Sequence, residues 1–166
     1  MSPDIVNEAM FGNSFCRFAF VRSPYSRLLA AFLDRAQVAG SVLTKKLRAS
    51  VGEAEVDFST FCEFVANHSD PRMLDPHVRP QSLVLCGGEV PLDFVGRFES
   101  LADDFRSITQ RLYGAPIELG FQSPSRTNAT SQLAQYYTPR LVEMVNEVYS
   151  DDFRMFGYEK RRTLSE

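Results

Sequence analysis

The stretch that decides the fold is residues 15–24, which read Phe-Cys-Arg-Phe-Ala-Phe-Val-Arg-Ser-Pro. Residues 15–21 are nearly all apolar and rich in aromatic side chains, which is typical of a strand buried on both faces of a parallel sheet. Arg22 ends this run. Ser23 is a good helix N-cap and Pro24 suits the first helical position, so we expect a helix to begin there and to end near Gly40. Apolar residues recur on one face of this helix, at Tyr25, Leu28, Leu29, Phe32, Leu33 and Ala36.

Apolar runs and helical patterns alternate along the rest of the chain. Short strands are predicted at residues 82–86 and 94–98. Helices are predicted from Asp57, from Ser100 to Gly114 and from Thr138, with a last turn from Asp151 or Asp152. Residues 41–56 read as helix fragments and loop, and residues 69–80 and 115–135 as loops. The alternation predicts an α/β domain with a mainly parallel sheet.

Length and charge restrict the class of protein. The 166 residues fit one domain, divided into a leader at 1–14, the domain at 15–158 and a charged tail at 159–166. The net charge is −3 and no basic block is longer than residues 160–162, which argues against a bulk nucleic-acid binder. A local anion pocket remains compatible with an acidic chain, because a few aimed groups suffice to hold a phosphate.

Cysteine and histidine usage gives no sign of a disulfide framework or a metal centre. The cysteines at 16, 62 and 86 are odd in number and widely spaced, and two histidines are too few for a multi-histidine site. No apolar run reaches the roughly 18 residues of a membrane span. We therefore expect no metal and no membrane span, and a cytoplasmic protein. The alternative is the Golgi lumen or a membrane-associated location if an anchor precedes this chain.

The junction at Arg22 has the features of an anion site. Ligands of open α/β sheets bind at the carboxyl ends of strands, and a helix N-terminus offers N–H groups and a positive dipole end. Arg22 would add a planar, permanent charge. These features predict an anion site formed by Arg22, Ser23 and the first helical turn. The alternative is that Arg22 pairs with a carboxylate of the core.

Five blocks of sequence resemble the carbohydrate sulfotransferase family. Residues 20–32, Phe-Val-Arg-Ser-Pro-Tyr-Ser-Arg-Leu-Leu-Ala-Ala-Phe, resemble its 3′-phosphate-binding motif. The other blocks are His-Val-Arg-Pro-Gln at 77–81, Asp-Phe-Val-Gly-Arg-Phe-Glu at 93–99, Tyr-Tyr-Thr-Pro at 136–139 and Asp-Phe-Arg-Met-Phe-Gly-Tyr at 152–158. They occur in family order over residues 15–158.

The resemblance implies a reaction and a set of donor contacts. Such enzymes transfer a sulfuryl group from 3′-phosphoadenosine 5′-phosphosulfate to a hydroxyl group, often of a sugar, on a P-loop-like, three-layer α/β fold. By this resemblance Arg22 would hold the 3′-phosphate. Ala30 stands where the family has a second 3′-phosphate contact, a serine, and Ser23 and Ser26 lie near enough in sequence to compensate. Arg27 could support the phosphate site or pair with Glu99 or Asp34.

Three further residues belong to the predicted site. Arg126 lies in a polar loop that matches the region where family members approach nucleotide or acceptor. His77 and Glu99 are the candidate bases for the acceptor hydroxyl. The alternatives are a solvated loop for Arg126, a structural hydrogen bond for His77, and a cap or ion pair for Glu99.

One family element is not found in the sequence. Family members carry a strand, a phosphosulfate loop with Lys or Arg, and a helix before the 3′-phosphate strand, and residues 1–14 contain neither Lys nor Arg. We therefore expect either a fragment of a longer enzyme, missing this strand, loop and helix, or a catalytically inactive relative that serves in binding or assembly. An open sheet edge would then favour an oligomer or a missing partner segment.

Overall fold

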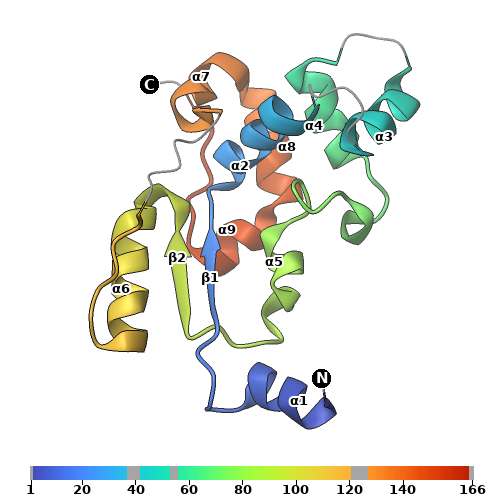
Figure 1. Cartoon of the computed structure of the whole chain (residues 1–166). Helices are drawn as coiled ribbons and strands as arrows, with labels where there is room; N and C mark the ends of the chain where they lie inside the picture. The colour runs from blue at the N-terminus through green and yellow to red at the C-terminus, as the bar shows by residue number, and fades with distance from the viewer. Residues whose placement is uncertain (1, 37–41, 53–55, 121–126, 165–166) are drawn as a thin grey trace. The chain divides into compact units, whose positions relative to one another are not determined.

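The computed structural model describes residues 2–36, 42–52, 56–120 and 127–164 (Figure 1). Helices predominate over these residues, and the sheet is small and parallel, so the α/β prediction is confirmed. The chain forms two compact units. The sheet unit comprises Met1–Arg22 and Gln81–Gln122, and the helical unit comprises Ser23–Pro80 and Ser123–Glu166.

The sheet unit contains two parallel strands, β1 (Phe18–Val21) and β2 (Phe94–Arg97). Phe18 pairs with Phe94 and Val21 with Arg97, so both strands end at the same edge. The strand predicted at residues 94–98 is confirmed, and the one predicted at 15–21 starts three residues later. After β2 a 3₁₀ helix (Phe98–Ser100) leads into α6 (Leu101–Tyr113), which ends at Gly114 in the left-handed conformation, with φ 72°.

An ion pair aligns the starts of the two strands. The backbone N–H and the Nε of Arg17 donate to Oδ2 of Asp93 at 2.8 and 3.0 Å, and Nη2 donates to Oδ1 at 3.2 Å. The hydrogen bonds from the Arg17 side chain and backbone lower the pKa of Asp93. Asp93, which opens the block at 93–99, therefore fixes the register of the strands.

Gly96 of β2 is required by a close approach. A Cβ atom at this position would lie 2.5 Å from Cε1 of Phe20, its neighbour on β1. Any larger residue would push the Phe20 ring out of place, so the short sheet depends on this glycine.

The strand predicted at residues 82–86 is wrong. A short helix, α5 (Gln81–Val84), occupies this position, and a 3₁₀ helix (Cys86–Gly88) follows it. A short apolar run does not distinguish a strand from a buried helical turn by periodicity. The preceding Pro80 suits a helix start. The leader also contains a helix, α1 (Pro3–Phe11), whose first turn is capped by the Ser2 side chain.

The helical unit begins with α2 (Pro24–Ala31), which continues as a π-helix (Phe32–Ala36). The predicted end near Gly40 lies outside the described residues. The unit continues with α3 (Val42–Val51), α4 (Phe58–Ala66), a 3₁₀ helix (Pro71–Met73), a second 3₁₀ helix (Ala129–Gln132), α7 (Leu133–Tyr136), α8 (Pro139–Val148) and α9 (Ser150–Phe156). The side chains of Asp57 and Thr138 cap α4 and α8 as predicted.

The core of the helical unit surrounds α2, which lies beside α4, α7 and α8 (Figure 1). Leu29, Leu47, Phe61 and Val142 are each 0% exposed. Burying a side chain of this size contributes about 1.5–3 kcal/mol, so this cluster fixes the position of α2. Leu164 of the charged tail is also buried in it. Among the described helices, none has both the length and the apolar character of a membrane span.

Candidate functional site

Arg22 follows the last residue of β1, and its backbone is held by Gln81. The Arg22 N–H donates to Oε1 of Gln81 at 2.9 Å, and Nε2 of Gln81 donates to the Arg22 carbonyl at 2.8 Å. The buried amide of Gln81 thus pairs with Arg22 as a neighbouring strand would. Because buried backbone groups must be paired, this contact fixes the chain where the strand ends.

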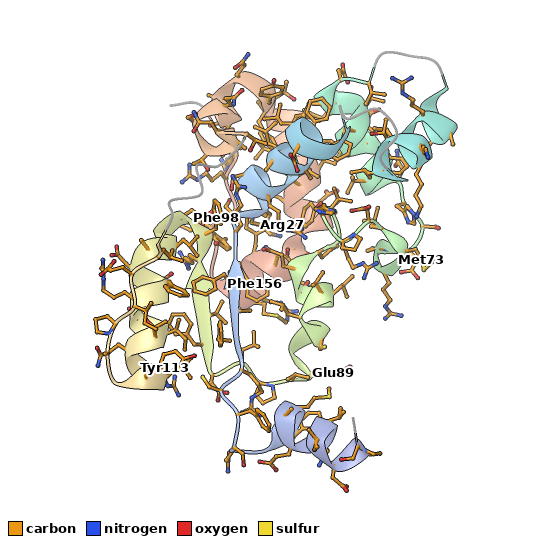
Figure 2. The ribbon with its side chains drawn as sticks, viewed as in Figure 1. Arg27, Met73, Glu89, Phe98, Tyr113 and Phe156 are labelled. Atoms are coloured by element: carbon orange, nitrogen blue, oxygen red, sulfur yellow. The ribbon has the colours of Figure 1, made fainter. Side chains whose placement is uncertain are left out.

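The side chain of Arg22 lies over an aromatic ring of the same unit. Its guanidinium carbon is 4.6 Å from the centre of the Phe98 ring. Phe98, labelled in Figure 2, follows β2 as Arg22 follows β1, so the two residues extend the register of the strand pair by one position. A cation–π contact orients the guanidinium plane. A fixed guanidinium at the carboxyl ends of parallel strands is suited to binding an anion.

The predicted contacts beyond Arg22 lie in the first two turns of α2, in the helical unit. Ser23 is the N-cap residue, and its side chain makes no capping hydrogen bond. The buried Ser26 donates through Oγ to the Ser23 carbonyl at 3.3 Å. Ala30 packs against the hydrophobic core. The Ala30 side chain is a methyl group packed on the core, so it offers no hydroxyl in place of the family's serine.

Arg27 binds the backbone of a loop. Its Nη1 donates to the carbonyl of Arg79 at 2.7 Å and its Nη2 to the carbonyl of Pro76 at 2.8 Å (Figure 2 labels Arg27). Burial lowers the pKa of Arg27, and the nearby Tyr149 and Asp152 oppose that shift. A guanidinium remains charged even so. Arg27 therefore ties the start of α2 to the loop that carries His77.

Two further side chains hold the same loop. The Tyr149 hydroxyl donates to the Val78 carbonyl at 2.6 Å, and burial raises the pKa of Tyr149, which keeps this donor protonated. Nε and Nη2 of Arg79 donate to the Leu74 carbonyl at 3.2 and 2.9 Å. Together with Arg27, these residues pair four carbonyl groups between residues 74 and 79. The loop predicted at 69–80 is therefore tightly fixed over this part.

His77 forms a pair with Asp75 at the surface of this loop. Oδ1 of Asp75 accepts the His77 backbone N–H at 3.0 Å and lies 2.7 Å from the ring Nδ1. The His77 side chain is 50% exposed and that of Asp75 is 17% exposed. Burial raises the pKa of Asp75, but the hydrogen bonds from His77 outweigh it and the pKa is lowered. With Asp75 ionised, the Nδ1 hydrogen faces the carboxylate and Nε2 is left as the proton acceptor.

The second candidate base lies in the other unit. Glu99 is exposed in the 3₁₀ helix after β2. It directly follows Phe98, whose ring contacts the Arg22 guanidinium. Arg126, the remaining predicted contact, lies outside the described residues. The sequence analysis did not predict the contacts made by Gln81, Asp75, Phe98 and Tyr149. Gln81 and Phe98 belong to the quoted family blocks, and that was the one signal available for them.

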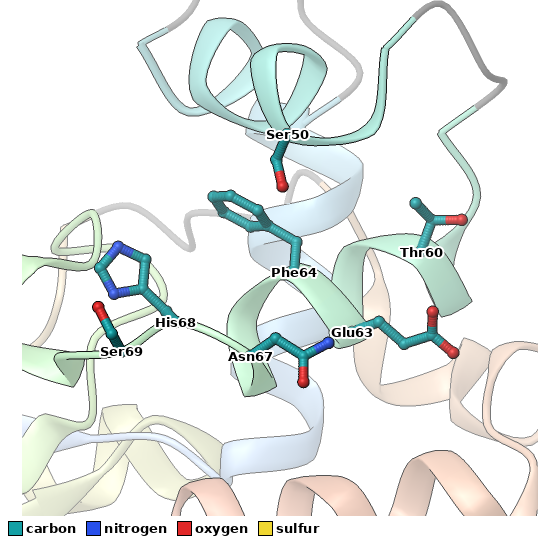
Figure 3. Close-up of a pocket in the computed structure, with 7 residues that line it drawn as sticks. All are labelled: Ser50, Thr60, Glu63, Phe64, Asn67, His68 and Ser69. Carbon is teal, nitrogen blue, oxygen red and sulfur yellow. The ribbon is translucent and has the colours of Figure 1, made fainter.

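A separate hollow of about 400 Å³ lies between α3 and α4 of the helical unit. Figure 3 shows the Phe64 ring of α4 pointing toward Ser50 of α3, with Asn67 and His68 at the end of α4. Glu63, on its wall, pairs with Arg140 at 2.9 Å. None of the predicted site residues lines this hollow. No group of three or more potential metal ligands occurs among the residues that the structure describes.

Comparison with known proteins places the chain in a family. The model of the sulfotransferase family matches residues 1–159. The chain belongs to the sulfotransferase family. Human carbohydrate sulfotransferase 9 is 30% identical over 171 residues, covering 88% of this chain and 38% of that protein. Mouse carbohydrate sulfotransferase 8 is 26% identical (89% and 41%), and zebrafish carbohydrate sulfotransferase 14 is 25% identical (92% and 46%).

These matches confirm the family that the five sequence blocks predicted. No solved structure is significantly similar to this sulfotransferase family member. The chain spans less than half the length of the three relatives named above.

Proposed function

We propose that this protein transfers, or forms the 3′-phosphate-binding part of a protein that transfers, a sulfuryl group from 3′-phosphoadenosine 5′-phosphosulfate to a hydroxyl of a carbohydrate-like acceptor. The family match over residues 1–159 supports the reaction class, and the names of the relatives support the acceptor class. We also propose for it the three-layer, P-loop-like arrangement of the family.

The position of Arg22 is the observation that supports the proposal most directly. Its backbone is fixed by Gln81 and its guanidinium lies against Phe98, at the carboxyl edge of the sheet. A planar guanidinium makes charge-assisted, often bidentate hydrogen bonds to phosphate, so this position suits the 3′-phosphate of the donor. Ser23 and Ser26 remain predicted additional contacts, and Arg27, which binds two carbonyls, is assigned instead to positioning the His77 loop.

We assign the acceptor side to His77. In the proposed step a base removes the acceptor O–H proton, the oxygen forms a bond to sulfur, and the sulfur–oxygen bond to the 5′-phosphate breaks. The products are a sulfate ester, 3′-phosphoadenosine 5′-phosphate and a proton, which the base then releases to water. The Asp75 contact favours His77 over Glu99, because it leaves Nε2 of an exposed imidazole as the acceptor.

The alternative function is that of an inactive relative which retains the fold for binding or assembly. Ala30 favours it, since the family serine is replaced by a side chain packed on the core. A hydrogen bond to a charged group is worth about 1.5–3 kcal/mol, so donor affinity would suffer from its loss. The two functions differ in whether the protein binds the donor's 3′-phosphate through Arg22.

Isothermal titration with 3′-phosphoadenosine 5′-phosphate tests the proposal. We expect the wild-type protein to bind, and Arg22→Ala to weaken binding about tenfold or more, because a charge-assisted contact is lost. Arg72→Ala is the matched control, since Arg72 is exposed in the Pro71–Met73 helix of the other unit. Far-ultraviolet circular dichroism verifies that each variant is folded. No binding by a folded wild-type protein, or equal binding by Arg22→Ala, overturns the proposal.

A further inference from the structure

The C-terminal tail, described over residues 159–164, is bonded to the first turn of α2 through a closed ring of three hydrogen bonds. The Tyr25 hydroxyl donates to Oδ1 of Asn146, and Nδ2 of Asn146 donates to the Arg161 carbonyl at 2.8 Å. The Arg161 N–H completes the ring by donating to the Tyr25 hydroxyl at 2.8 Å. All three residues belong to the helical unit. The ring holds both backbone groups of Arg161 without using its side chain, so it fixes the path of the tail.

A second contact holds the tail three residues further on. Leu164 is 6% exposed and belongs to the hydrophobic core, whereas the two residues between it and Arg161 are exposed. Over residues 159–164 the backbone is neither helix nor strand. The course of the tail is therefore set by the ring at Arg161 and by the burial of Leu164.

Tyr25 is held on its other sides by two aromatic residues. Its ring packs edge-on against Tyr137, with the centroids 5.8 Å apart, and is tilted against Phe153 at 5.1 Å. The Tyr137 hydroxyl also donates to the Tyr25 carbonyl at 2.9 Å. Burial raises the pKa of Tyr25 and outweighs the hydrogen bond from Arg161, so the hydroxyl keeps the proton that it donates to Asn146. The residue is thus fixed at its ring, its hydroxyl and its carbonyl.

Tyr25 lies between Ser23 and Ser26, the two serines that are predicted to contact the donor's 3′-phosphate. The same turn is closed by the Arg27 N–H, which donates to the Ser23 carbonyl at 2.9 Å. An anion at a helix N-terminus is bound by N–H groups whose direction is set by this first turn. Binding groups of an active site must be held within about 0.5 Å of their productive geometry. Contacts that fix Tyr25 therefore also fix the binding groups on either side of it.

We propose that the tail positions the first turn of α2 for the donor's 3′-phosphate, acting through the bond between the Arg161 N–H and the Tyr25 hydroxyl. This role rests on the proposed function. Tyr25 is then a positioning residue, which acts on the donor through the serines and the N–H groups of its turn. Covering the core would require Leu164 alone, whereas the ring also bonds the tail to the residue between the two predicted contacts.

Two substitutions at residue 161 separate its N–H group from its charge. Arg161→Ala and Arg161→Pro remove the same side chain, which takes no part in the ring, but only proline also removes the N–H that donates to Tyr25. In isothermal titration with 3′-phosphoadenosine 5′-phosphate, we expect Arg161→Ala to bind like wild type. Arg161→Pro should bind about fivefold more weakly, because it loses one hydrogen bond. Tyr25→Phe removes the same bond from its other partner and should match Arg161→Pro.

Adenosine 5′-monophosphate shows whether the effect is confined to the 3′-phosphate. This nucleotide lacks that group, so its binding should be the same in Arg161→Pro as in wild type. A general loss of structure would instead weaken the binding of both nucleotides alike, and far-ultraviolet circular dichroism verifies that each variant is folded. Equal weakening of both nucleotides overturns the proposal. Equal affinities of Arg161→Pro and Arg161→Ala for 3′-phosphoadenosine 5′-phosphate overturn it as well.

Amide hydrogen exchange, measured without nucleotide, tests the anchoring of α2 itself. The Arg27 amide, which closes the first turn, should exchange about fivefold or more faster in Arg161→Pro than in Arg161→Ala. The amides of α6, in the sheet unit, should be unchanged and serve as the internal control. Equal exchange of Arg27 in the two variants overturns the positioning role even when the wild-type protein binds nucleotide. Faster exchange in Arg161→Pro, combined with a wild-type protein that binds no nucleotide, overturns the donor role of this turn and supports its anchoring by the tail.

Discussion

The side-chain amide of Gln81 pairs with both backbone groups of Arg22, at 2.9 and 2.8 Å, and so takes the place of a third strand at the end of β1. Residue 81 is 59 positions away in sequence. This relationship joins the block at 77–81 to the block at 20–32, because Gln81 of the first fixes the backbone of Arg22 in the second.

Gln81→Ala should therefore lower both stability and donor affinity. The partly buried N–H and carbonyl of Arg22 lose the hydrogen bonds from the Gln81 amide, and an unsatisfied group of this kind costs about 1–3 kcal/mol. Urea unfolding measures the first effect, and titration with 3′-phosphoadenosine 5′-phosphate measures the second. Gln110→Ala is the control, since the Gln110 amide donates to the Gly114 carbonyl at an exposed helix end. Equal stability of the two variants would contradict the role assigned to Gln81.

Arg27→Lys should loosen the loop that carries His77. A lysine ammonium is a compact point charge and does not reproduce a planar fork that spans the Pro76 and Arg79 carbonyls. We expect a loss of at least about 1.5 kcal/mol in the free energy of unfolding, with faster proteolytic cleavage near residue 77. Arg154→Lys changes an exposed pair with Asp151 and should stay within about 0.5 kcal/mol of wild type. Cleavage of Arg27→Lys at the wild-type rate would show that Arg27 is not needed there.

Asp75 should make stability depend on pH in the acid range. Its folded pKa is lowered, so its ionised form stabilises the protein at neutral pH, and that contribution is lost as pH falls through the folded value. The pKa of an unfolded aspartate is about 3.9. The melting temperature of Asp75→Asn should therefore fall less than that of wild type as the pH drops from 7 to 3.5. Parallel plots of melting temperature against pH for Asp75→Asn and wild type would contradict a stabilising Asp75–His77 pair.

The sequence predicted the elements that depend on local signals. Ser23-Pro24, Asp57 and Thr138-Pro139 mark helix starts that the structure confirms, because caps act within one turn. The strand predicted at 82–86 is wrong because its apolar run lacks any feature that separates a strand from the helical turn of α5. The partners of Arg22 and Arg27 could not be derived from spacing, since they lie 49–76 residues away: Gln81 and Phe98 for Arg22, Pro76 and Arg79 for Arg27.

The family blocks are close in space as well as ordered in sequence. Within the sheet unit, Gln81 and Phe98 both contact Arg22. Within the helical unit, the Tyr137 hydroxyl donates to the Tyr25 carbonyl at 2.9 Å. The charge of Asp152 also opposes the lowering of the Arg27 pKa by burial. Every later block therefore contacts or acts on the first one. A resemblance carried by five blocks reflects two sets of contacts, one made to Arg22 after β1 within the sheet unit and the other made to α2 within the helical unit.

The tail after residue 158 should contribute to stability, although its composition suggests a surface segment. Leu164 is 6% exposed within the core of the helical unit, and Arg161 is bonded to Tyr25. Leu164→Ala should cost about 2–4 kcal/mol, because it removes buried methyl groups and leaves a cavity. Leu83→Ala, at a position 37% exposed, is the control and should cost much less. Guanidinium unfolding followed by circular dichroism gives both values. A Leu164→Ala midpoint equal to that of wild type would mean that the tail does not pack on this core in solution.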